Sequence, residues 1–245
     1  MIYEASEFAF TPPPLISRAR RVLIKPNAVD EQPYPVSTSR ETLSAIIDSI
    51  KRVSDADIII LEGTSTGESI YPIYKALKYD FPRVLMLDVK DCIWVEVENP
   101  LPHPFAVATF WVPNVVISSD YLISITPHRI CGRSGYFSIR NLLSLLPVSK
   151  YSGDEVVGWG TLYELEIDRV IADLYFTLPF DLGIIDARQK LFYDEEKLQV
   201  KSENYNKIFA GEPYEIDREA SQQDKVISGY LDFIEAGKSE LDTWG

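Results

Sequence analysis

The stretch Leu122–Pro147 reads LISITPHRICGRSGYFSIRNLLSLLP and guides the interpretation of the rest of the chain. The apolar run Tyr121–Thr126 predicts a buried strand, and the glycine-, serine- and arginine-rich turn after it predicts where that strand ends. Apolar residues then recur at helical spacing, which predicts a helix that begins near Ser134-Gly135 and carries Arg140 and Asn141. Polar groups at the end of a buried strand are typical of ligand sites in α/β proteins.

The chain before this stretch alternates between short apolar strands and helices. Arg21–Lys25, Asp57–Leu61 and Val84–Leu87 predict strands, and such apolar runs are expected where helices cover both faces of a sheet. Apolar residues at helical spacing predict two helices between them. The first helix begins with a capping box that has Thr38 as N-cap and Glu41 three residues later. This βαβαβ order is half of a doubly wound sheet.

The alternation changes after this half-unit. Valines and glutamates alternate at the start of Ile93–Val112, and a proline-rich turn follows, which predicts an antiparallel insertion. Leu182–Ile185 and Lys207–Ala210 predict further strands. We therefore expect an α/β fold: a mostly parallel sheet with helices on both faces, plus an antiparallel insertion near residues 93–112. We expect one domain over residues 1–245, with a small antiparallel subdomain at 90–118.

Composition and charge narrow the class of function. The formal net charge of −13 argues against binding to nucleic-acid phosphates or to an anionic membrane surface. No apolar run approaches the roughly 18 residues of a spanning helix, and the start of the chain does not resemble a signal peptide, so we expect a cytoplasmic protein. Neither Cys92 nor Cys131 belongs to a CxxC motif, which argues against an iron–sulfur cluster held within this chain.

Polar side chains follow several of the predicted parallel strands. Since the carboxyl ends of parallel strands share one edge of a sheet, these side chains are expected to line one crevice. There, Lys25, Arg129 and Arg140 would neutralise a small anion, and amide and hydroxyl groups would orient it. The full set of predicted ligand-binding residues is Lys25, Asn27, Glu62, Thr64, Ser65, Thr66, His128, Arg129, Arg140 and Asn141.

Carboxylates also follow three of the predicted strands. Glu62, Asp88 and Asp186 supply the oxygen ligands that hard cations prefer, so a divalent-cation site built from them is a second hypothesis. His128 has the chemistry of a general acid, base or metal ligand, although a lone histidine at a strand end is more often a hydrogen-bonded surface residue. His103 lies in a proline-rich loop and is interpreted as structural.

Three further features have structural interpretations. The loop Glu62–Ser69 resembles an anion cradle, but it equally fits an ordinary turn with Ser69 as N-cap. Asp173 follows Arg169 by four residues, which predicts a surface ion pair. Asp217 is expected in the first turn of the last helix, where a carboxylate suits the helix dipole.

Five short motifs occur in a fixed order along the chain. They are Lys25-Pro26-Asn27, Arg140-Asn141-Leu142, Ile171–Leu174, Asp181–Asp186 and Ala210–Asp217. In this order they resemble the uncharacterised family catalogued as domain of unknown function 362. The resemblance implies an α/β fold and an association with iron–sulfur or redox systems.

The chain departs from that family at two places. Pro127–Ile130 stands where the family usually carries Lys-Thr-His, and Arg188–Leu191 stands where it carries Gly-Asn-Gly-Pro. The ferredoxin-type cysteines of many members are also absent from the sequence. The resemblance therefore implies a member that binds without reacting, or one that relies on a partner for electrons.

Three hypotheses of function follow, and whether the protein is an enzyme is left open. The leading hypothesis is a protein that binds a small anionic ligand, with or without a divalent cation, at the carboxyl ends of the strands. The alternative is a non-catalytic accessory that docks on a redox or iron–sulfur partner, where acidic character would steer association. In the third, the polar residues only cap strands.

Overall fold

The computed structural model describes residues 1–28, 30–153, 158–194 and 199–244. The described residues form a sheet of eight strands and a separate two-stranded ladder. The strands are β1 (Ile2–Glu4), β2 (Arg21–Lys25), β3 (Asp57–Glu62), β4 (Val84–Asp88), β5 (Trp94–Glu98), β6 (Thr109–Pro113), β7 (Tyr121–Cys131), β8 (Ser134–Tyr136), β9 (Leu182–Asp194) and β10 (Gln199–Gly211). The helices are α1 (Arg40–Val53), α2 (Tyr71–Ala76), α3 (Asn114–Ile117), α4 (Gly160–Tyr163), α5 (Ile167–Thr177), α6 (Pro213–Asp224) and α7 (Tyr230–Trp244), with 3₁₀ turns at Pro14–Arg18, Val89–Asp91, Arg140–Leu145 and Val148–Lys150.

The large sheet is mixed and mostly parallel. Its strand order is β1-β10-β9-β7-β2-β3-β4, with β8 paired to β7. The pairs β9–β7, β7–β2, β2–β3 and β3–β4 are parallel, whereas β1–β10, β10–β9 and β7–β8 are antiparallel. The predicted α/β fold class is therefore confirmed.

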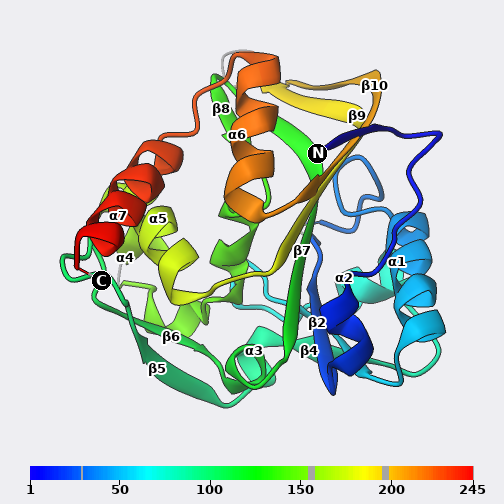
Figure 1. Cartoon of the computed structure of the whole chain (residues 1–245), viewed down its shortest axis with the longest axis horizontal. Helices are drawn as coiled ribbons and strands as arrows, with labels where there is room; N and C mark the ends of the chain where they lie inside the picture. The colour runs from blue at the N-terminus through cyan, green and yellow to red at the C-terminus, as the bar shows by residue number, and fades with distance from the viewer. Residues whose placement is uncertain (29, 154–157, 195–198, 245) are drawn as a thin grey trace.

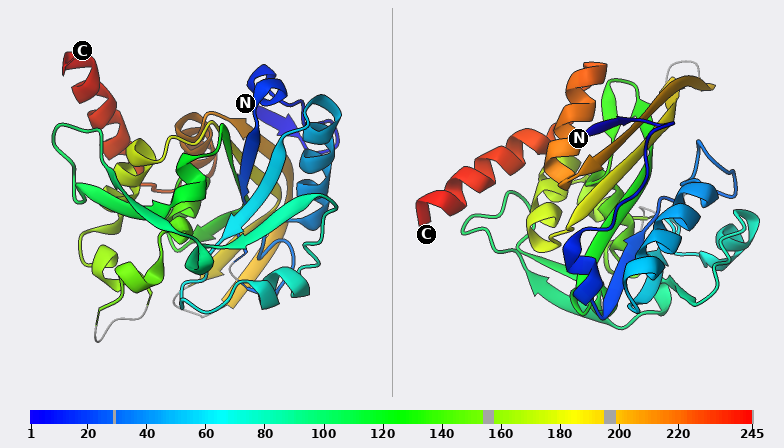
Figure 2. Two further views of the ribbon diagram at one scale, coloured as in Figure 1. Left: turned by 90° about the horizontal axis from the view of Figure 1, so that it is seen from below. Right: turned by 45° about the vertical axis from the view of Figure 1, so that its right-hand side comes forward.

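Helices cover both faces of this sheet (Figure 1). α1 and α2 lie on one face, and α5, α6 and α7 lie on the other, as the turned views also show (Figure 2). The alternation of side chains along a strand explains both layers, because successive residues point to opposite faces. Val22 and Ile24 of β2 join the core beneath α1, whereas Leu23 joins the core on the opposite face.

The antiparallel insertion is confirmed as the ladder β5–β6. Trp94 pairs with Pro113 and Glu98 with Thr109, so the ladder lies within and just beyond the predicted range 93–112. Phe110 and Val112 of β6 are fully buried against the core on the α5 face. None of the helices that the structure describes combines the length and apolar character needed to cross a membrane.

Two local predictions were wrong. The N-cap of α1 is Ser39, which accepts from the Thr42 backbone N–H, because the Thr38 hydroxyl is bonded to the Ile125 carbonyl and the Asn27 N–H. Ser134 and Gly135 do not begin a helix. They belong to β8, which folds back on β7 through a turn at Gly132, where a φ of 57° suits a residue without a Cβ.

The long hairpin β9–β10 extends well past the predicted strands Leu182–Ile185 and Lys207–Ala210. Beside it, the register of β7 against β9 shifts: Asp186 pairs with Pro127, but Lys190 pairs with the next residue, His128. Residues 187–189 are therefore extra on β9, and the hydroxyl of Tyr34 contacts the backbone of Asp186 and of Gln189. This bulge in β9 lies beside Pro127 and His128 of β7.

Candidate functional site

A buried ion pair lies at the carboxyl ends of β2 and β3. The Nζ atom of Lys25 is 2.8 Å from both carboxylate oxygens of Glu62, and their side chains are 0% and 1% exposed. Burial lowers the pKa of Lys25, and the neighbouring Glu62 charge opposes that effect. Lys25 also donates to the Pro26 carbonyl and to Asn141 Oδ1. The lysine is therefore engaged inside the protein and does not face an incoming anion.

Glu62 connects three separate segments. Its Oε2 accepts from the Ala28 N–H, and its Oε1 accepts from the Gly63 N–H and the Ser144 hydroxyl. These donors come from the loop after β2, the loop after β3 and the 3₁₀ turn Arg140–Leu145. A carboxylate with this many donors is well stabilised in its charged form, so its role is to hold the crevice together.

Asn141 is the second connecting residue. Its Nδ2 lies within hydrogen-bond distance of the carbonyls of Lys25 and Pro26 and of the Ser124 hydroxyl, and its Oδ1 accepts from Lys25 Nζ and Asn27 Nδ2. The amide thus joins the ends of β2 and β7 to the 3₁₀ turn. Lys25, Asn27, Glu62 and Asn141 converge in one network, in which Asn141 comes from the 3₁₀ turn and the other three lie at strand ends.

Arg129, near the end of β7, is a partly buried residue that joins this network through Asn27. Its Nη2 donates to Asn27 Oδ1 at 3.2 Å and to the Val36 carbonyl at 2.5 Å. Its Nε is buried without a hydrogen-bond partner, and no carboxylate forms an ion pair with it within the described part of the chain. Burial lowers the pKa of Arg129. A guanidinium nevertheless stays charged in proteins, so its positive charge is uncompensated here.

A small cavity of about 40 Å³ adjoins Arg129. This volume is on the scale of one water molecule, so it fits only a compact polar group. Arg140 also lines it, but the Arg140 guanidinium lies 3.9 Å above the Tyr136 ring and 3.5 Å from an oxygen of Asp168. The residues that line the cavity are Asn27, Thr126, Arg129, Tyr136, Phe137, Arg140 and Asn141.

Several predicted ligand-binding residues do not join this cavity. Thr64, Ser65 and Thr66 are not buried, and the Thr64 hydroxyl donates to the Glu68 carbonyl within its own turn. Ser69 does not cap α2, whose N-cap is Ile70. The loop thus forms a turn closed by its own hydrogen bond, without the Ser69 cap that its alternative interpretation included.

His128 is fully buried and is not the surface residue that its position suggested. Its Nε2 lies 2.6 Å from Asp224 Oδ2, and its ring packs against Phe137, Tyr205 and Phe209. Nδ1 has no hydrogen-bond partner among the described residues, and Asp224 is also paired with Lys190. His128 and Arg129 are adjacent on β7, so their side chains point to opposite faces of the sheet. His128 points into the layer beneath α6, away from Arg129.

The predicted cation site does not assemble. Asp88 accepts from the N–H groups of Ile70 and Lys90, whereas Asp186 accepts from the Thr42 hydroxyl and pairs with Arg188. Among the described residues, no group of three His, Cys, Asp or Glu side chains is placed to hold a metal ion. Each of these strand-end carboxylates has found its own nearby donors, so the three do not share one ion.

Two buried aspartates were misjudged from the sequence. Arg169 pairs with Glu166 and not with Asp173. Asp173 is fully buried and accepts hydrogen bonds from the N–H groups of residues 105–107. Asp217 lies past the first turn of α6 and accepts from Ser138, Ile139 and Tyr230. The sequence does contain a signal for their burial, since both aspartates lie on the apolar stripe of their helices.

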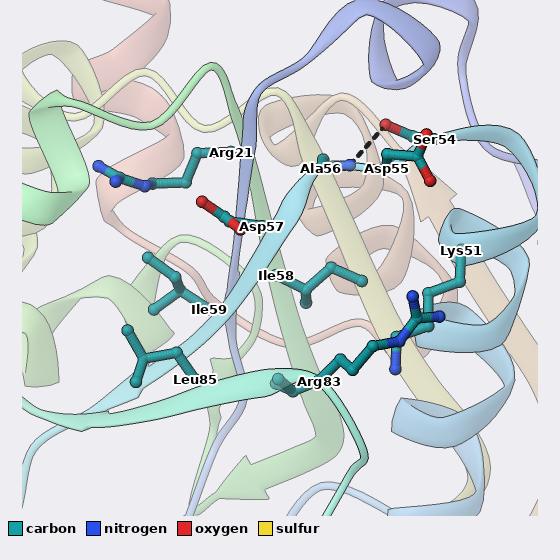
Figure 3. A pocket seen from close by; sticks show the side chains of 11 residues that line it. Arg21, Lys51, Ser54, Asp55, Ala56, Asp57, Ile58, Ile59, Arg83 and Leu85 are labelled. Carbon is teal, nitrogen blue, oxygen red and sulfur yellow. Dashed lines mark hydrogen bonds between the residues drawn. The ribbon is translucent and has the colours of Figure 1, made fainter.

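A larger hollow lies elsewhere, at the amino ends of β2, β3 and β4 (Figure 3). It measures about 540 Å³, and side chains of both charges line it, including Arg21, Asp57 and Arg83. Lys51 is bonded to the Pro82 carbonyl. Because the charges are mixed and ligands of open α/β sheets bind at the opposite, carboxyl ends, we centre the candidate site on Arg129.

Thr126, Tyr136, Phe137 and Ser144 are site residues that the sequence did not indicate, and the last three come from the segment after β7. These three follow the predicted strand in a segment whose hairpin geometry was not foreseen, and each reaches the site through β8 or the 3₁₀ turn. No spacing rule relates them to Lys25 or Glu62, which lie many residues earlier in the chain.

Comparison with known proteins places this geometry in context. No curated protein matches the chain. Among solved structures, the lactate racemase apoprotein from Thermoanaerobacterium thermosaccharolyticum is similar, with a TM-score of 0.55 and 14% sequence identity. The similarity covers 89% of this chain and 53% of that one, so this chain spans about half of that protein's length. At this identity the likeness concerns the fold alone.

A family model matches residues 22–222, a range that contains the Lys25–Glu62 pair, Arg129, Asn141 and both buried aspartates. The order of short motifs from Lys25 to Asp217 agrees with this range. The chain therefore belongs to the family described as "Domain of unknown function (DUF362)".

Proposed function

We propose that the protein binds a small anion through the guanidinium of Arg129, at the carboxyl ends of β2 and β7. The observation that supports this proposal is the charge of Arg129, which has no acidic partner among the described residues although its Nε is buried. Removing an ion from water is costly unless an opposite charge accompanies it, and a bound anion would supply that charge.

The other charged side chains near Arg129 support the same conclusion, because each basic one is paired with an acidic one. Lys25 is paired with Glu62, and Arg140 lies beside Asp168. Arg129 is thus the net positive charge of a network that is otherwise neutral. Guanidinium groups bind carboxylates and phosphates with parallel hydrogen bonds, which makes these anions the chemical class expected here.

The cavity beside Arg129 limits the group that would bind. Its volume of about 40 Å³ accommodates a single compact head group, and Asn27 and Thr126 add polar side chains to its wall. Asn27 is itself oriented by its bond to Asn141, so the wall is held in place before any ligand arrives. Such preorganisation reduces the entropy cost of binding. The proposal includes no cation, because the oxygens of Glu62 already receive Lys25 and three other donors.

Isothermal titration calorimetry tests the proposal with three sodium salts: acetate, lactate and phosphate. Lactate is included because the similar structure is named as a lactate racemase apoprotein. The variant is Arg129→Gln, and Arg20→Gln is the matched control, since Arg20 is a surface arginine paired with Asp120. We expect wild type and Arg20→Gln to bind at least one salt equally well, and Arg129→Gln to bind it at least tenfold more weakly.

Two results would contradict the proposal. One is wild-type protein that binds none of the three salts, and the other is Arg129→Gln with unchanged affinity. Thermal unfolding of each variant must show that the fold is retained. The accessory hypothesis gives a different pattern: no salt binds, but Arg129→Gln weakens the recovery of a protein partner.

A further inference from the structure

A second, larger pocket shares Arg129 with the small cavity. Its volume is about 310 Å³, at the lower end of the range of small-molecule sites. Among the residues that the structure describes, Arg129 alone lines both hollows. The other described residues that line the larger pocket are Asp30, Gln32, Val36, Cys131, Leu191, Tyr193 and Val200.

The walls of the larger pocket are mainly apolar. Leu191 and Tyr193 belong to β9, and Val200 lies opposite Tyr193 on β10. Val200 is 57% exposed, which is unusual for a valine in a strand of this sheet. Apolar surface left open beside a charged group is favourable for a ligand that combines the two characters, because burial of its apolar part adds to the charge interaction.

From this arrangement we propose that the ligand is a monocarboxylate with an apolar tail, whose head group binds Arg129 and whose tail lies along Leu191, Tyr193 and Val200. This inference rests on the proposed function, since it needs the anion on Arg129. The head group fits the 40 Å³ cavity, and the tail fits the 310 Å³ pocket.

The charge pattern argues for one negative charge rather than two. Asp30 is exposed and lines the larger pocket, so a second carboxylate or a phosphate on the tail would meet a like charge. Within the described ranges, Arg129 is also the one cation of the site that has no carboxylate partner. A dicarboxylate of the same length is therefore expected to bind more weakly than the monocarboxylate.

Calorimetry with the series acetate, butyrate and hexanoate tests the tail. We expect affinity to rise about two- to fourfold for each added methylene, as expected for partial to full burial. Hexanol, which lacks the charge, and adipate, which carries a second one, should both bind at least tenfold more weakly than hexanoate. Arg129→Gln should weaken the binding of every acid in the series.

Val200→Glu tests the position of the tail, because it places a carboxylate in the apolar pocket. The matched control is Leu85→Glu: Leu85 is 54% exposed, and β4 is separated from β10 by four strands of the sheet. We expect Val200→Glu to weaken hexanoate at least tenfold and to leave acetate within twofold, while Leu85→Glu changes neither.

The outcomes separate the two proposals. If acetate binds through Arg129 but chain length has no effect, or if Val200→Glu spares hexanoate, the tail inference is wrong and the anion site stands. If none of the acids binds wild-type protein but lactate or phosphate binds through Arg129, the tail inference is wrong and the anion site stands; if lactate and phosphate also fail to bind, both proposals fail. If hexanoate binds equally to Arg129→Gln, its binding is nonspecific and the inference is overturned.

Discussion

The Nζ atom of Lys25 lies 2.8 Å from both carboxylate oxygens of Glu62, in a site where neither side chain reaches solvent. This pair connects the ends of two parallel strands and, through Asn141, the 3₁₀ turn that carries Arg140. Lys25 also donates to Asn141, which lines the cavity beside Arg129. From the sequence, Lys25 and Arg129 were both expected to neutralise an anion. In the structure Lys25 is paired with Glu62, whereas Arg129 has no carboxylate partner among the described residues.

Lys25→Met should destabilise the protein by about 3–5 kcal/mol, because it leaves the Glu62 carboxylate buried and unpaired. Urea unfolding followed by circular dichroism measures this loss. The double variant Lys25→Met/Glu62→Gln removes the unpaired charge and should recover at least half of it. A single variant that loses less than about 1 kcal/mol would show that Glu62 is neutral or hydrated in the folded state.

Asp217 should make stability depend on pH. Burial raises its pKa from 3.8 to about 6, against hydrogen bonds from Ser138, Ile139 and Tyr230 that lower it. Between these two pH values the folded state binds more protons than the unfolded state, so stability falls as pH rises from 3.8 to about 6 and is level above. The loss attributable to this residue is about 3 kcal/mol.

Comparison of wild type with Asp217→Asn isolates this effect from other titrating groups. The difference in unfolding free energy should shrink between pH 4 and pH 7, because only the wild type loses stability through this group. A difference that is constant over this range, measured by urea unfolding at each pH, would refute the raised pKa. Asp242→Asn, on the last helix, serves as a surface control.

Asp173→Ala should cost about 3 kcal/mol or more. The carboxylate accepts from the N–H groups of Phe105, Ala106 and Val107, and its removal leaves buried donors without partners. Arg169→Ala is the matched control on the same helix, and it should cost less than about 0.5 kcal/mol because its pair with Glu166 is exposed. Similar costs for the two variants would favour the surface pair predicted from the sequence.

Asn27→Asp should weaken anion binding at least tenfold, because it places a carboxylate where Asn27 Oδ1 now lies, 3.2 Å from Arg129 Nη2. Asn27→Ala removes the same hydrogen bonds without adding charge and should retain most of the affinity. Titration of both variants with the acid that wild type binds best gives the comparison. Equal weakening by Asp and Ala would show that Asn27 acts through its amide and that the charge of Arg129 is not decisive.

Much of the fold was predictable from local sequence. Apolar runs such as Asp57–Leu61 form strands because both of their faces are buried, and helical spacing located α1, α5 and α7. The rule that parallel strands end at the same edge of a sheet places Lys25, Asn27 and Glu62 close together, but it also grouped Asp88 and Asp186 with them, and these two have other partners. The hairpin of β7 and β8 was not predicted, because the turn at Gly132 depends on the pairing of β8 with β7, which local sequence patterns do not show.

The sequence by itself determined the α/β alternation, the antiparallel insertion and the residues that stand at strand ends, since these depend on periodicities of a few residues. Only the tertiary structure decided the partner of each charge. Lys25 and Glu62 neutralise one another, Asp186 pairs with Arg188, and Arg129 has no carboxylate among the residues that the structure describes. The reason is physical: a buried charge takes the donors that packing brings to it, and those donors come from segments far apart in the chain.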